Sequence, residues 1–204
     1  MRFERVVVSG EGTTCDVVWK GERATLRTPL EGQHQASNLA FSLVMLDAAG
    51  DQYATSLTDA ARSLPSVRIP GRFQHVGRFI FDVAHNPAGS EVVVQTLQAV
   101  APPEPVTVVL CVLRDKDWRA MMTTLARVAT HFVLTMAPTA PASRAWDLDE
   151  AFVFARDNGL SAEIVADFAR ALGRAQAGAG TVLVTGSFHT VGDAMALLQV
   201  SPLG

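Results

Sequence analysis

The sequence predicts an α/β fold, Rossmann-like, in which a mostly parallel sheet carries helices on both faces. From Val76 onward, short apolar runs alternate regularly with amphipathic stretches, which is typical of successive βα units. The runs at 106–112 and 181–185 are almost continuously apolar, as expected of strands covered on both sides. Hydrophobic residues make up 49% of the chain and charged residues 18%, which indicates a well-filled core.

Each expected strand in this part is followed by an expected helix. Five βα units in succession predict parallel strands joined by right-handed crossovers. The expected strands are 78–83, 106–112, 131–136, 162–165 and 181–185. The expected helices are 87–100, 117–128, 147–157, 167–177 and 189–199.

The first seventy residues have a different pattern. We expect strands within 3–8 and 15–27, a helix over 35–49, and a second helix over 56–64 that ends before Pro65. These elements provide a thin core for an independent domain. If they are a severed part of a larger domain, we expect some apolar surface from Phe41, Val44 or Leu57 to be exposed and to drive association.

Composition excludes several functional classes. A net charge of -3 argues against a nucleic-acid partner or a polybasic membrane role. No segment approaches the roughly 20 apolar residues of a membrane span, and the N-terminus lacks the apolar core of a signal peptide. Cys15 and Cys111 lie in apolar runs without metal-ligand spacing, so we expect buried free thiols in a cytoplasmic protein.

The segment from Pro70 to Pro87 contains the strongest indication of a binding site. A Pro-Gly turn precedes Arg72, and a short apolar strand then leads to Asp82 and His85. Open α/β sheets bind ligands at the carboxyl ends of their strands, and a helix N-terminus there offers free N–H groups to phosphate. Pro87 suits the first helical turn and the asparagine before it suits the N-cap, so the segment predicts a nucleotide site.

Four motifs in order extend this interpretation. They are P-G-R-F-Q from Pro70, F-D-V-A-H-N-P from Phe81, D-K-D at 115–117 and V-T-G-S at 184–187. Together they resemble the C-terminal half of folylpolyglutamate synthase or dihydrofolate synthase, in the Mur ligase superfamily, over roughly residues 30–198. The resemblance implies that residues 70–204 form the glutamate-binding C-terminal domain, preceded over 1–69 by an α+β remnant of the central ATP-binding domain.

The same resemblance implies an activity. The family joins L-glutamate to a folate or pteroate carboxylate through an acyl phosphate, using ATP and Mg²⁺. For the ATP site the resemblance implies that Arg72 contacts the phosphates and that Asp82 binds the ribose. His85 would contact a phosphate or stabilise the turn by hydrogen bonding. It places His34 and Asn38 beside adenine, with helix capping as the alternative. Only one histidine is present at that i, i+4 spacing, so no metal site is expected there.

For glutamate, the resemblance implies a role for three residues at the same sheet edge. Lys116 would bind the amino acid. Asp115 would orient the lysine or cap the next helix, and for Asp117 helix capping is the favoured role. Ser187 would offer its hydroxyl and neighbouring amides to the glutamate carboxylate.

The loop that binds the phosphates in a typical ATP site is missing from this sequence. The loop G-x-x-x-x-G-K-[ST] is absent, and the two lysines, Lys20 and Lys116, lie in no such loop. We therefore expect the site and the Mg²⁺ ligands to depend on a missing N-terminal region, and the chain alone to be inactive. A non-catalytic nucleotide- or ligand-binding module is the alternative, and a dinucleotide oxidoreductase is a weaker one because no G-x-G-x-x-G follows strand 78–83.

Overall fold

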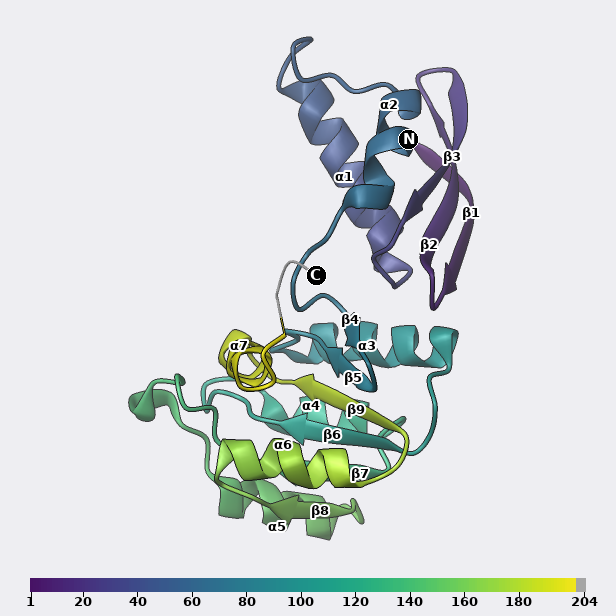
Figure 1. Ribbon diagram of the computed structural model, residues 1–204. Coiled ribbons are helices and arrows are strands. Elements are labelled where there is room, and N and C mark those ends of the chain that lie inside the picture. Colours follow the sequence, from purple (N-terminus) through teal and green to yellow (C-terminus); the bar gives the residue numbers. More distant parts are fainter. Residues whose placement is uncertain (201–204) are drawn as a thin grey trace. The chain divides into compact units, whose positions relative to one another are not determined.

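The computed structural model describes residues 1–200 and contains two compact units (Figure 1). The N-terminal unit is Met1–Ile69, and the C-terminal unit begins at Pro70. Within residues 1–200, no helix has the length and apolar character needed to cross a membrane.

The N-terminal unit combines a three-stranded antiparallel sheet with helices. Trp19 pairs with Glu22 across a tight turn in which Lys20 and Gly21 both have positive φ (50° and 83°). This hairpin divides the stretch expected as strand at 15–27 into two strands. The elements are β1 (Arg2–Ser9), β2 (Gly12–Trp19), β3 (Glu22–Thr28), α1 (His34–Ala48), α2 (Leu57–Ser63) and η1 (Leu64–Ser66).

A small core holds this unit together. Inward-facing residues of β2 and β3 pack against one side of α1 and against α2. Leu57 belongs to this core and is 2% exposed, so the expectation that it lies at the surface is wrong. Phe41 and Val44 are exposed, as predicted. The core members are Cys15, Val17, Leu26, Ala36, Leu39, Leu43, Leu57 and Ala60.

The C-terminal unit is built on a six-stranded sheet whose order is β4-β5-β9-β6-β7-β8. All pairs are parallel except β4 with β5, so the predicted α/β architecture is confirmed. The short hairpin strand β4 was not predicted. The strands are β4 (Gln74–Val76), β5 (Phe79–Phe81), β6 (Val106–Leu110), β7 (His131–Leu134), β8 (Ala162–Ile164) and β9 (Thr181–Thr185).

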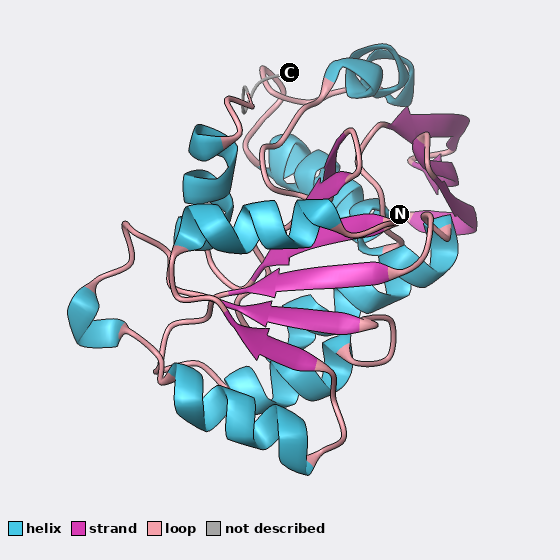
Figure 2. Ribbon diagram, turned by 60° about the horizontal axis from the view of Figure 1, so that its bottom comes forward, coloured by secondary structure: helices cyan, strands magenta, loops and turns pink. Residues whose placement is uncertain are grey.

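Helices cover both faces of this sheet (Figure 2). α3 packs against α4, and α6 packs against α7 on the sheet. The helices are α3 (Pro87–Val100), α4 (Trp118–Leu125), α5 (Leu148–Asp157), α6 (Phe168–Ala177) and α7 (Phe188–Leu197), with a short helix η2 (Ala142–Arg144) before α5. Each of the five parallel strands is therefore followed by a helix, as the sequence pattern predicts.

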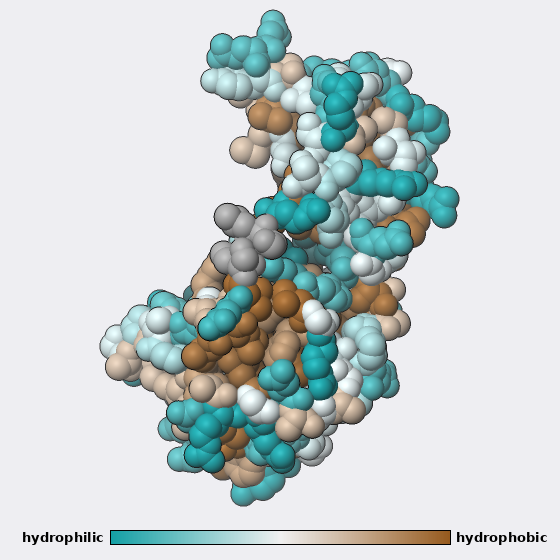
Figure 3. Space-filling model, viewed as in Figure 1, coloured by the Kyte–Doolittle hydropathy of each residue, from teal (hydrophilic) through white to brown (hydrophobic). Residues whose placement is uncertain are grey.

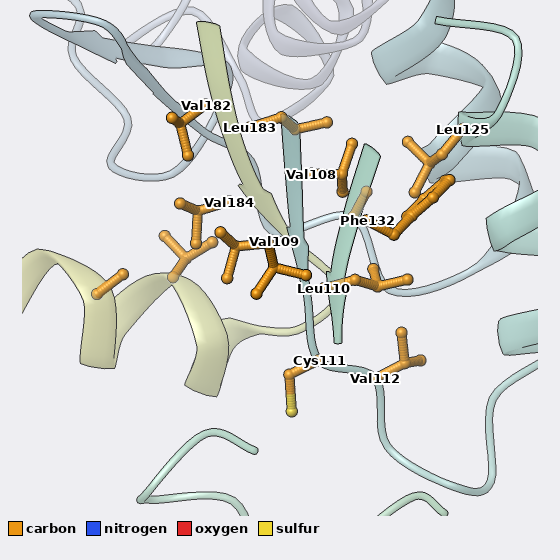
Figure 4. Packing of buried hydrophobic residues seen from close by; sticks show 14 of the residues in the cluster. Val108, Val109, Leu110, Cys111, Val112, Leu125, Phe132, Val182, Leu183 and Val184 are labelled. Carbon is orange, nitrogen blue, oxygen red and sulfur yellow. The ribbon is translucent and has the colours of Figure 1, made fainter. Parts of the chain in front are cut away.

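The sheet interior is apolar on both faces. Val108, Val109 and Leu110 of β6 are fully buried beside Val182 and Val184 of β9 (Figure 4). Burying a side chain of this size stabilises the fold by roughly 1.5–3 kcal/mol relative to leaving it exposed. These two strands therefore form the rigid centre of the C-terminal unit. Cys111 follows β6, and both cysteines are free and buried, as predicted.

The strand order determines which loops meet. β9 is last in the sequence but lies between β5 and β6. The parallel strands β5, β9 and β6 consequently end side by side, at the point where the direction of winding changes. The segments that follow these strands carry most of the predicted site residues, and this is where open α/β sheets bind ligands.

Candidate functional site

The Pro-Gly-Arg loop before β4 has a fixed backbone conformation. Gly71 has φ 65°, and a Cβ there would lie 2.8 Å from Val83 Cγ1, so glycine is required. Phe73 is buried and has a positive φ of 52°, which is rare for a residue with a side chain. Val83 N donates a hydrogen bond to Gly71 O at 2.9 Å. The exposed Arg72 therefore projects from between two residues that the fold holds in place.

Asp82 connects this loop to the end of β5. Its Oδ2 accepts a hydrogen bond from Phe73 N at 3.0 Å, and its Oδ1 accepts one from Ala84 N at 2.8 Å. Burial raises the pKa of Asp82 from 3.8 to about 6, although the two backbone N–H groups and the charges of Arg72 and His85 act in the opposite direction. Each oxygen keeps a second lone pair for a ligand hydroxyl. Asp82 is thus a structural link as well as the predicted ribose ligand.

His85 has a defined ring orientation and tautomer. Its Nδ1 lies 3.0 Å from Val83 O, and because a carbonyl can only accept, Nδ1 carries the proton. Nε2 is then the ring atom left for a ligand. The ring packs against Phe188, with centroids 5.8 Å apart, and Phe188 is itself 61% exposed. An exposed aromatic ring therefore lies beside the imidazole. The sequence analysis did not predict this contact.

The turn after His85 begins helix α3 as predicted. Asn86 is the N-cap, and its Oδ1 accepts a hydrogen bond from Gly89 N at 2.8 Å. Pro87 occupies the first turn, where no backbone donor is needed.

Ser187 is the N-cap of α7 and is only 3% exposed. Its Oγ accepts a hydrogen bond from Thr190 N at 3.0 Å and lies 2.7 Å from Thr190 Oγ1, which donates to Cys111 O at 2.8 Å. Gly186 precedes it with φ 115°, and a Cβ there would lie 2.4 Å from Cys111 O. The hydroxyl thus connects the end of β9 to the end of β6.

Lys116 lies within a charged cluster after β6. Its Nζ is 3.4 Å from Asp115 Oδ2. Asp115 also accepts two hydrogen bonds from Arg144, from Nε at 2.9 Å and from Nη2 at 2.8 Å. Hydrogen bonding to Arg144 lowers the pKa of Asp115 to about 2. Asp117 caps α4 through Ala120 N at 3.0 Å, which confirms the favoured structural role for that residue.

Arg144 is a site-region residue that sequence reasoning did not find. It belongs to η2, between the expected strand 131–136 and the expected helix 147–157, and lies 29 positions from Asp115. A groove of about 670 Å³ lies beside the cluster. Its lining includes Arg114, Trp118 and Arg119, and the Arg119 guanidinium lies 4.1 Å from the centroid of the Trp118 ring. The edge near Lys116 therefore has both cations and a hollow.

The predicted adenine contacts lie in the N-terminal unit, near the start of α1. Asn38 Nδ2 donates to Gln35 Oε1 at 3.0 Å, and Gln35 Nε2 lies 2.9 Å from His34 Nε2. The N-cap of α1 is Gln33, which makes no side-chain cap hydrogen bond. The capping alternative for His34 and Asn38 is therefore wrong.

Within residues 1–200, no group of three or more His, Cys, Asp or Glu side chains is arranged to hold a metal ion. These residues therefore contain no metal site built from three or more such side chains.

Comparisons with known proteins agree with this geometry. Residues 71–188 match the family described as Mur ligase, glutamate ligase domain. The dihydrofolate synthase/folylpolyglutamate synthase of Escherichia coli is 33% identical over 174 residues, which are 82% of this chain and 39% of that protein. The chain thus spans less than half the length of this relative.

Solved structures give the same result across both units. Folylpolyglutamate synthase of Mycobacterium tuberculosis, complexed with ADP, superposes with a TM-score of 0.86 at 26% identity, over 98% of this chain and 48% of that one. E. coli FolC, in complex with DHPP and ADP, gives 0.75 at 29% identity, over 95% and 45%. With the four motifs on the carboxyl edge of a parallel sheet, this chain belongs to the Mur ligase family of ATP-dependent ligases and corresponds to the C-terminal portion of its folylpolyglutamate and dihydrofolate synthases.

Proposed function

We propose that this chain supplies the C-terminal portion of an ATP-dependent ligase that joins L-glutamate to the carboxylate of a folate or pteroate. The observation that carries the proposal is that the Arg72 loop and Asp82 lie at the carboxyl end of β5 and the segment before Lys116 at that of β6, on either side of β9. An anion-binding loop and a cationic cluster at one sheet edge suit two substrates that must react with each other.

The reaction has two steps. The γ-phosphoryl group of ATP passes to the acceptor carboxylate, which gives an acyl phosphate and ADP. The amine of glutamate then attacks the carbonyl carbon, the C–O bond to phosphate breaks, phosphate leaves, and the nitrogen loses a proton as the amide forms. The protein would hold both partners and exclude water, since water would hydrolyse the acyl phosphate.

Residues of the Arg72 loop would bind the nucleotide. A planar guanidinium can grip two phosphate oxygens, and the fixed backbone on both sides of Arg72 lowers the entropy lost when it does so. To bind a phosphate, His85 would take up a second proton and donate Nε2–H to a phosphate oxygen, since Nδ1–H is already donated to Val83 O. Asp82 would accept from a ribose hydroxyl through its remaining lone pairs.

The Lys116 cluster would bind glutamate. The lysine ammonium suits a glutamate carboxylate, and Asp115 would act as a positioning residue that Arg144 keeps ionised. Backbone N–H groups at the start of α7, beside Ser187, would take a second carboxylate.

Residues of the N-terminal unit would contribute contacts to adenine. In this proposal residues 1–69 are the remnant of a central ATP-binding domain, with His34 and Asn38 beside adenine. The amide group of Asn38 has both a donor and an acceptor, which suits the edge of that ring. Magnesium would be held mainly by residues outside this chain, and residues 1–200 contain no cluster of three or more metal-ligating side chains. We expect the chain alone to be inactive, and the buried free thiols support a cytoplasmic location.

Lysine NMR provides a direct test. The chain has only two lysines, so selective ¹³C labelling at Cε gives one signal from Lys116 and one from Lys20 as an internal control. We expect L-glutamate to shift the Lys116 signal in a saturable way and to leave the Lys20 signal unchanged. Arg144→Gln, which releases Asp115, should weaken the effect. If neither signal moves, or both move equally, Lys116 does not hold the amino acid.

Calorimetry with ATP separates this proposal from its alternative, a non-catalytic module that binds nucleotide by itself. Phosphate-binding loops of the P-loop type are absent from the sequence, so we expect weak or undetectable binding of ATP to this chain alone. Submicromolar affinity would favour the module.

A further inference from the structure

Helix α1 presents an apolar side to solvent. Phe41 is 69% exposed, Val44 46% and Met45 69%. Positions i, i+3 and i+4 lie on one side of a helix, so these three side chains form one continuous stripe, which we call the α1 outer face. In Figure 3, apolar atoms reach the surface of the N-terminal unit beside the helix labelled α1 in Figure 1.

The opposite side of α1 is also apolar. Ala36, Leu39 and Leu43 pack into the core of the N-terminal unit. Among the fifteen residues of α1, Asp47 is the only acidic side chain, and no Lys or Arg is present. A helix that borders water normally carries charges on its outer side, whereas a helix that is apolar all round is buried between two layers. The sequence of α1 is thus that of a helix covered on both sides.

The size of the face argues against a second copy of this chain as its partner. With side chains exposed to this degree, the α1 outer face presents on the order of 400 Å² of apolar surface. A stable interface between separate proteins needs about 800 Å² from each partner. This face is more suitable as one part of a larger contact with the remaining portion of the same ligase, in which other elements supply the rest of the buried area.

The relatives indicate where that other part comes from. The M. tuberculosis structure matches 98% of this chain, which includes α1, yet the match uses only 48% of its own length. The remaining half of such a ligase can supply a layer over the helix. We propose that the α1 outer face docks an apolar layer of the ligase portion that this chain does not contain, an inference that rests on the proposed function.

The test uses the intact chain and two probes, the separately expressed N-terminal portions of the E. coli and M. tuberculosis relatives. Phe41→Asn combined with Met45→Gln removes the face, and Leu197→Gln, at a side chain that is 51% exposed in α7, is the matched control. We expect at least one probe to bind the unchanged chain and the control equally, and to bind the double variant at least tenfold more weakly.

Two further measurements distinguish the outcomes. Because the face is exposed in this chain, the double variant should unfold at the same temperature as the unchanged chain, whereas a clear loss of stability would show that the face is already packed and would overturn the proposal. Binding of neither probe, or a dimer of the chain that the double variant abolishes, would also overturn it. The glutamate titration monitors Lys116 in the C-terminal unit, so its failure remains separable from these results.

Discussion

Neutralising Asp82 should change how the stability of the C-terminal unit depends on pH. The pKa of this carboxyl is raised from 3.8 to about 6 by burial. Because the pKa is higher in the folded state, the contribution of Asp82 to the free energy of unfolding is fully present below pH 3.8. It is lost as pH rises through about 6. Since one pKa unit corresponds to about 1.4 kcal/mol, ionised Asp82 costs the folded state on the order of 2–3 kcal/mol at neutral pH.

The measurement is urea unfolding at pH 4 and pH 7.5. Introducing Trp19→Phe into every protein leaves Trp118 and Trp146, which are both 4% exposed and both in the C-terminal unit, so fluorescence follows that unit. Asp82→Asn cannot ionise. The free energy of unfolding of the parent minus that of the variant should therefore fall by about 2 kcal/mol between pH 4 and pH 7.5.

Comparison with the variant is necessary because other carboxyls act in the opposite direction. The pKa of Asp115 is lowered, so its contribution is lost as pH falls. The exposed Asp149→Asn serves as the control for removing a carboxylate at the surface of the same unit. If the free energy of unfolding of the parent minus that of Asp82→Asn stays constant or rises with pH, burial does not destabilise the ionised form of Asp82, and the reasoning is refuted.

Further predictions concern the surrounding framework. Gly71→Ala should destabilise the C-terminal unit by about 1–3 kcal/mol more than Gly77→Ala in urea unfolding, because both glycines have positive φ but only the first would bring a Cβ against a neighbouring side chain. Equal losses would contradict this. Thr190→Val should cost about 1–3 kcal/mol by the same assay, since it removes the buried bond to the main-chain carbonyl after β6, whereas Thr190→Ser should retain most of the stability. Arg144→Gln should raise the pKa of Asp115 from about 2 toward 3.8 in a carboxyl ¹³C titration, and an unchanged value would show that another group holds it down.

The amino-acid sequence by itself determined the features that depend on neighbouring residues. Apolar periodicity located the five βα units of the C-terminal unit, because strands and helices repeat over two and 3.6 residues wherever they lie. Asn86 and Asp117 were predicted as caps and are caps, since a cap needs only the next helical turn. The Asp82 segment could also be predicted as a site, because its motif is continuous in the chain, and its role as a ligand site remains a prediction.

Only the tertiary structure decided features that depend on residues far apart in sequence. The insertion of β9 between β5 and β6 brings the ends of three strands together, and no local pattern specifies that order. Arg144 reaches Asp115 across 29 positions, and Ser187 is occupied by a hydrogen-bond network that extends to Cys111. The physical reason is the same throughout. Periodicity and capping are properties of a short segment, whereas burial, ion pairing and strand order are set by which segments pack together.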